Sequence, residues 1–153
     1  MVAGTLAASV VSGVSLQKSN DLILGEFRPG TSSGTVELDV DGSGFAASRA
    51  SSGGVSLAGA SFSAAEFYVL ARAGARFSVQ LPPAITIERI GGGESMQIDG
   101  FRSRIRQDCG SGASPSGCPG SPYTLLVGAT LHVEPGQKAG RYVGTFMVTV
   151  NQL

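Results

Sequence analysis

Residues 136–153 read GQKAGRYVGTFMVTVNQL and contain the most regular pattern in the chain. In an extended chain, successive side chains point to opposite faces, so residues two apart share a face. This stretch divides into two such sets: Tyr142, Gly144, Phe146, Val148 and Val150, and then Val143, Thr145, Met147 and Thr149. The pattern predicts a β-strand. Because so little sequence follows it, the strand could form the edge of a sheet, and the question is which segment pairs with that edge.

The composition favours one all-β domain. The 153 residues include 23 glycines, and 42% of the residues are hydrophobic. Glycine and serine recur between the apolar runs, as expected for many turns, and the length suits a single domain. The 11 basic and 11 acidic residues cancel, so no overall field would attract nucleic acid. The first 20 residues lack a basic segment and show alternation, so we expect neither a signal peptide nor a transmembrane span there.

Short alternating runs appear along the whole chain. They lie at residues 34–40 (GTVELDV), 84–90 (AITIERI), 96–101 (MQIDGF) and 124–135 (TLLVGATLHVEP). Residues 65–83 contain two more runs around a turn near Gly74, which predicts a hairpin. The stretches DGSG, ASSGG and LPP are predicted turns. No window has helical spacing for three turns, so we expect seven to ten strands in two packed antiparallel sheets, an immunoglobulin-like sandwich or a jelly roll.

Two cysteines bear on the compartment. Cys109 and Cys118 enclose the sequence GSGASPSG, which is flexible enough to bring the thiols together. We predict a disulfide, which would indicate the periplasm or the cell exterior. The alternative is a pair of unpaired surface thiols. No other cysteine or histidine lies near enough in sequence to suggest a zinc site.

Catalytic and metal-binding motifs are weak. His132 is the only histidine, and it is out of phase with Leu131 and Val133, which predicts a surface position. No nucleophile-elbow motif accompanies it. The sequence DVDGSG at residues 39–44 has the acidic spacing of a calcium loop, but the twelfth position is Ala50 where such loops have a glutamate. We therefore expect neither an enzyme nor a metal or cofactor site.

Three arginines form a regular row in FRSRIRQ, residues 101–107. In an extended segment Arg102, Arg104 and Arg106 would project to one face at intervals of about 7 Å. Such a row could bind sulfate, phosphate or an acidic surface. The alternative is a solvated strand face that is balanced by carboxylates. The acids considered for that role are Glu88, Asp99 and Asp108.

Four motifs in order suggest a family. DLILGEF, GTVELDV, LLVGATLHV and GRYVGTFMVTVNQ together resemble the bacterial secreted domain-of-unknown-function family 4402. That family is in turn similar to spore coat U-like and archaic chaperone-usher pilin domains. The resemblance implies an immunoglobulin-like fold that lacks one strand, which the N-terminal segment of a neighbouring subunit supplies.

On this resemblance, residues 1–11 are an N-terminal strand and candidate donor, and residues 12–153 are a single β-sandwich domain. The alternating donor residues would be Leu6, Ala8 and Val10. The acceptor would be the face with Tyr142, Gly144, Phe146, Val148 and Val150. The implied partners are other copies of the chain, a periplasmic chaperone and an outer-membrane usher, with passage through the periplasm to the cell surface. Alternatively, the N-terminal strand pairs within its own domain, and the protein is a monomeric secreted module that binds a glycan or another surface ligand.

Overall fold

The computed structural model describes residues 2–10, 15–42, 46–70, 76–107 and 123–153. These residues form strands and no helix, which confirms the all-β prediction. The strands are β1 (Val2–Val10), β2 (Ser15–Asn20), β3 (Leu22–Arg28), β4 (Gly34–Asp39), β5 (Ser48–Gly53), β6 (Ser56–Ala58), β7 (Ala65–Leu70), β8 (Phe77–Gln80), β9 (Ala84–Arg89), β10 (Ser95–Gln107), β11 (Tyr123–Val133) and β12 (Tyr142–Gln152).

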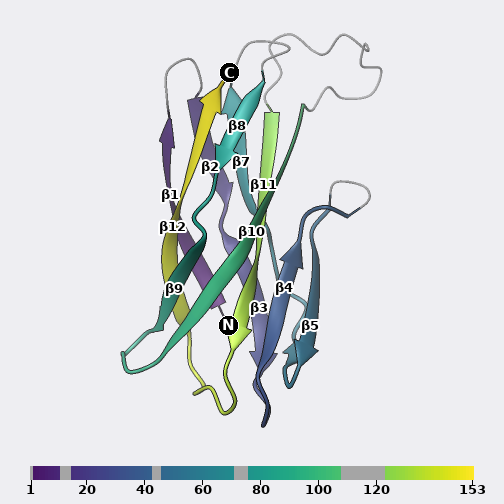
Figure 1. Ribbon diagram of the computed structural model, residues 1–153, viewed down its shortest axis with the longest axis vertical. Coiled ribbons are helices and arrows are strands. Elements are labelled where there is room, and N and C mark those ends of the chain that lie inside the picture. The colour runs from purple at the N-terminus through teal and green to yellow at the C-terminus, as the bar shows by residue number, and fades with distance from the viewer. Residues whose placement is uncertain (1, 11–14, 43–45, 71–75, 108–122) are drawn as a thin grey trace.

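The strands join into one curled, mainly antiparallel sheet that folds around a core as a β-sandwich does (Figure 1). Their order is β2-β7-β11-β10-β9-β12-β1-β3-β6. β4 pairs with β11 beyond the end of β7 and carries β5 on its other edge, and β8 pairs with β12. Among the described strands, β1 and β12 are the one parallel pair. Antiparallel strands with one buried face explain why alternation is so clear in the sequence.

The predicted alternation is confirmed on the strands that form the core. On β12, Phe146, Val148 and Val150 are buried, whereas Met147 is 55% exposed. β4 buries Val36 and Leu38 and leaves the side chains between them partly exposed. β11 buries one set along its whole length (Leu125, Val127, Ala129, Leu131 and Val133), but the other set alternates with it only after residue 129, because Thr124 and Leu126 are buried as well.

The predicted hairpin over residues 65–83 is wrong. β7 pairs with β2 on one edge and with β11 on the other, whereas β8 pairs with β12. Because both edges of β7 have distant partners, no edge remains for β8. Phe67 and Val69 are fully buried there, and that burial outweighs the advantage of a short connection. On β8, the Phe77 ring packs edge-on against the Tyr123 ring of β11, with ring centroids 4.9 Å apart.

The predicted strand number is too low, and the stretch ASSGG is not simply a turn. β5 covers most of it, and β6 follows at once. β5 is built largely of exposed small residues and pairs with β4, an antiparallel neighbour from Gly34 to Asp39. A strand that buries almost nothing shows no apolar alternation, so periodicity cannot detect it.

Arg49 of β5 joins two edges of the curled sheet, the β4–β5 hairpin and the edge formed by β3 and β6. Its Nη1 donates to the carbonyl oxygens of Leu24 and Glu26 at 3.0 and 3.3 Å. Its Nη2 donates to those of Ala58 and Gly59 at 3.4 and 2.9 Å. The guanidinium also lies 5.3 Å from the centre of the Phe62 ring, a cation–π distance. One side chain thus binds β3, β6 and the segment after β6.

Two further expectations concern the disulfide and a transmembrane span. Cys109 and Cys118 lie outside the described residues, so their disulfide stays a prediction. Within the described ranges, no helix is long and apolar enough to cross a membrane.

Candidate functional site: the β1 slot and the arginine row

β1 lies between β12 and β3, and we call this position the β1 slot (Figure 1). Its nine residues pair in parallel with β12, from Val2 with Tyr142 to Val10 with Val150. Its first residues also pair antiparallel with Leu22, Ile23 and Gly25 of β3. The two segments that the sequence suggests as donor and acceptor therefore lie side by side, within one chain.

The residues named for the two segments are register partners within the chain. Leu6, Ala8 and Val10 are the register partners of Phe146, Val148 and Val150. Gly4 is the partner of Gly144. A Cβ at position 144 would lie 2.6 Å from Cγ2 of Ile87, so glycine allows β9 to pack closely against β12 here. The backbone of β12 is thus held by β9 and β8 on one edge and by β1 on the other.

Tyr142 fixes the start of β12. Its hydroxyl donates to the carbonyl oxygen of Lys138, four residues upstream, at 2.7 Å. The Gln137 amide donates to the same hydroxyl at 3.0 Å and to the Ser95 carbonyl at 3.3 Å. A tyrosine at the start of a strand that bonds a few residues upstream is the tyrosine corner of immunoglobulin-like sandwiches. In the sequence, Tyr142 is marked by its strand phase alone, although the turn-rich stretch EPGQKAG at residues 134–140 is a further usable signal.

The corner also indicates which position β1 takes. In immunoglobulin sandwiches the corner lies on strand F, which has strand C on one side and strand G on the other. β9 precedes β12 in sequence, as strand C precedes strand F, and it pairs with β12 antiparallel. The remaining neighbour is β1, so the N-terminal segment occupies the place of strand G and runs in parallel.

A bulge in β10 places the arginines on the outer face. Asp99 is paired with Thr130 and Arg102 with Gly128, so β10 has one extra residue between these pairs. Gly100 lies there with a φ of +59°, a left-handed conformation that favours glycine. Before the bulge, Met96 and Ile98 are buried; after it, the alternating inward set is Phe101, Ser103 and Ile105, and the outward set is Arg102, Arg104 and Arg106.

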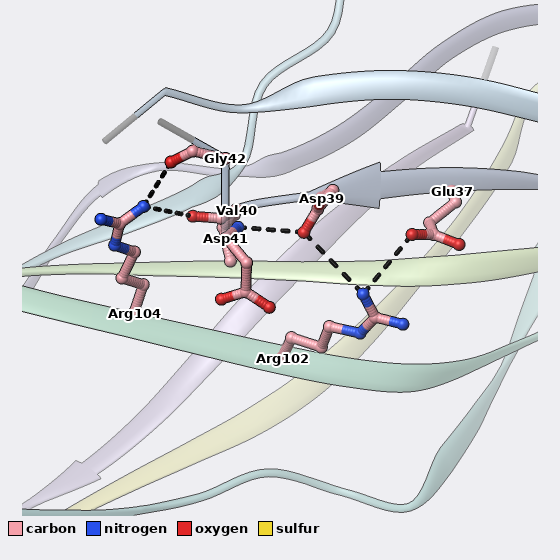
Figure 2. A network of polar contacts seen from close by, with 7 residues as sticks. All are labelled: Glu37, Asp39, Val40, Asp41, Gly42, Arg102 and Arg104. Carbon is pink, nitrogen blue, oxygen red and sulfur yellow. Dashed lines mark hydrogen bonds and ion pairs between the residues drawn. The ribbon is translucent and has the colours of Figure 1, made fainter. Parts of the chain in front are cut away.

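Arg102 and Arg104 have partners on and beyond β4 (Figure 2). Nη1 of Arg102 lies 3.5 Å from a carboxylate oxygen of Glu37 and 3.8 Å from one of Asp39. Arg104 donates to the carbonyl oxygens of Val40 and Gly42. An anion that binds Arg102 would therefore compete with two carboxylates. Anion binding by the row stays a prediction.

The partner acids are not those considered from the sequence. Glu37 and Asp39 belong to β4, which is separated from β10 by β11. The register partner of Arg102 on β11 is Gly128, where a Cβ would lie 2.2 Å from the Leu38 carbonyl oxygen. Glycine at this position allows β4 to approach, which brings its carboxylates within reach of Arg102. Arg102 and its two carboxylates lie on β10 and β4, which are distant in sequence and separated by β11. No local sequence pattern can therefore indicate this ion pairing.

His132 lies on the outer face, because its neighbours Leu131 and Val133 are buried. Its Nε2 is 2.7 Å from a carboxylate oxygen of Asp99 on the adjacent strand, and both side chains are partly exposed. Within the described ranges, no group of three His, Cys, Asp or Glu residues is placed to hold a metal ion. The histidine forms a surface pair between β10 and β11.

The fold and the slot define a class: an immunoglobulin-like sandwich whose corner-bearing strand is flanked by the N-terminal segment. The chain belongs to the family described as Domain of unknown function (DUF4402), whose model matches residues 14–152. The match covers β2 to β12 and begins after β1. Neither the curated proteins nor the solved structures include a match to the chain.

Proposed function

We propose that the protein is a structural subunit of a fimbria-like extracellular filament in which neighbouring subunits exchange β1. The observation that carries the proposal is the parallel pairing of β1 along nine residues of β12, in the place of the final sandwich strand. Strand addition of this kind gains affinity from main-chain hydrogen bonds, which any subunit can offer to another.

Exchange needs little free energy because the contacts are the same in both states. β1 of one copy can occupy the β1 slot of the next with the register that it has in its own domain, as in domain swapping. The family model starts at residue 14, which supports a domain whose common part excludes β1. The resemblance to spore coat U-like and pilin domains adds secretion, a periplasmic chaperone and an outer-membrane usher to the proposal.

Crosslinking distinguishes pairing within one chain from pairing between chains. Ala7 and Met147 are register partners, and Met147 is exposed, so a cysteine at position 147 would not disturb the core. Two single variants, Ala7→Cys and Met147→Cys, would be mixed in a Cys109→Ser, Cys118→Ser background and oxidised. We expect a disulfide-linked heterodimer on a non-reducing gel. Replacing Met147→Cys by Leu153→Cys, which is exposed but out of register, is the matched control.

Deletion of residues 2–11 provides a second test. The shortened chain should stay folded with an open slot, and a synthetic peptide of residues 2–11 should raise its thermal midpoint in proportion to the logarithm of peptide concentration. A scrambled peptide should have no effect. In filament assays, the shortened chain should cap growth at substoichiometric amounts. Unfolding of the shortened chain that the peptide does not reverse would show that β1 belongs to its own domain, against the exchange model.

The second candidate function is a monomeric secreted module that binds a glycan or another surface ligand. Pairing of β1 within its own chain favours it, because the sheet is then complete without a neighbour. Absence of the heterodimer at every concentration, with wild-type protein monomeric in electron micrographs, would support this function over the filament.

A further inference from the structure

A cavity of about 370 Å³ lies at the end of the sandwich where β3 ends and β12 begins. This size is in the range of sites for small molecules. The residues that matter for its chemistry are Glu26, Phe27, Arg28, Gln137, Lys138 and Tyr142. It is separate from the arginine row, and no sequence motif indicates it.

The loop that forms one wall of the cavity is fixed by hydrogen bonds. Tyr142 and Gln137 bind each other, and Tyr142 also binds the backbone at Lys138. The Ala139 carbonyl accepts from Nε of Arg89 at 2.9 Å, and the amide of Gly136 donates to the Gly30 carbonyl at 3.1 Å. The wall is therefore preorganised, so a ligand would not have to order it.

The charges of the lining favour a singly charged anion. Two cations, Arg28 and Lys138, stand against one carboxylate, Glu26. The Arg28 side chain is exposed and makes no hydrogen bond or ion pair with the described part of the chain. Lys138 is paired at 3.3 Å with Glu94, which is not part of the lining. A guanidinium with no partner is available to bind a carboxylate in the bidentate manner.

The remaining lining suits a ring with hydroxyl groups. Phe27 contributes an aromatic ring that is only partly buried, whereas Tyr142 is buried and supports the wall. Gln137 uses its amide NH₂ group in the wall, which leaves its carbonyl oxygen as an acceptor for a hydroxyl. We propose that this cavity binds an acidic saccharide unit, a pyranose ring that bears a carboxylate. The proposal extends the second candidate function, and it holds for a monomer and for a filament subunit alike.

Titration of the full chain with sodium galacturonate, followed by backbone amide NMR, tests the proposal. We expect shifts at residues 26–29 and 137–142. Galactose, which has the ring without the charge, should bind at least tenfold more weakly, the loss expected for one charge-assisted hydrogen bond. Inorganic phosphate, which has the charge without the ring, should also bind more weakly.

Matched charge variants complete the test. Arg28→Gln should weaken galacturonate binding about tenfold. Arg76→Gln removes the same charge at an exposed position outside the lining and should leave binding unchanged. Equal binding of galactose and galacturonate, tighter binding of phosphate, equal effects of the two variants, or no binding of galacturonate would each overturn the proposal. None of these outcomes depends on whether β1 exchanges.

Discussion

Arg49 and Arg102 show how differently two arginines can be used in one sheet. Arg49 donates to four backbone carbonyl oxygens on β3, on β6 and on the residue after β6, and its Nε is buried without a partner in the described part of the chain. Arg102 is 48% exposed and lies near two carboxylates at 3.5 and 3.8 Å. Removal of a partly buried guanidinium leaves part-buried carbonyls without a donor, whereas water replaces an exposed ion pair at little cost. The neutral partners of Arg49 therefore matter more to stability than the charged partners of Arg102.

The largest effect is expected at Gly25, which makes room for Arg49. Gly25 has a φ of +85°, and a Cβ there would lie 2.2 Å from Nη1 of Arg49 and 2.4 Å from the Ser61 carbonyl oxygen. Gly25→Ala should lower the free energy of unfolding by about 4 kcal/mol, because it adds backbone strain and displaces the guanidinium. Urea denaturation measures this. Gly91→Ala is the control: it has a φ of +98° but nothing within 4 Å, so it adds strain alone.

Arg49→Met keeps much of the apolar stem and removes the donors. We expect a loss of about 3 kcal/mol in the free energy of unfolding, since four carbonyl oxygens lose their donor. Arg49→Lys should recover part of this loss at most. The lysine ammonium cannot bond the carbonyl oxygens of β3 and those at the end of β6 at the same time, as the planar guanidinium fork does. Full rescue by lysine would show that charge, and not the fork, stabilises this region.

The expected contribution of Arg104 to stability lies between those of Arg49 and Arg102. It donates to the carbonyls of Val40 and Gly42 and is half-buried. Arg104→Gln should cost about 1 kcal/mol of unfolding free energy, which corresponds to a fall of a few degrees in the thermal midpoint of a chain of this size. Calorimetry would resolve it. A loss as large as that of Arg49→Met would show that Arg49 and Arg104 contribute equally to stability.

The smallest effect on stability is expected for Arg102→Ser, at about 0.5 kcal/mol or less. The same residue gives the sharpest test of the arginine row as an anion site. If sulfate binds the row, Glu37→Gln should tighten binding, because a competing carboxylate is removed, and Arg102→Ser should abolish it. Glu88→Gln is the control, since Glu88 is not a partner of the row. Sulfate binding that none of these changes affects would leave the row as a solvated strand face.

Features that recur at a regular spacing along the chain can be predicted from the sequence. β4 and β12 alternate with period two because each buries one face, and the arginine row is visible because the outer face of β10 is polar. The hairpin prediction failed because β7 pairs with strands that are distant in sequence. Arg49 has no signal, because its partners are backbone carbonyls, which every residue has. The partners of Arg102 and the cavity likewise depend on segments that only the fold brings together.

The parallel direction of β1 and β12 has a mechanical consequence. The Val2 end of β1 lies beside the start of β12, so it is remote from the Gln152 end of β12 (Figure 1). Tension applied between these two points would slide the strands past each other and load the bonds of all nine paired residues at once. An antiparallel pair pulled from its open end would instead separate one bond at a time. A subunit joined to its neighbours through this slot would resist pulling forces along its strands far better than forces across them.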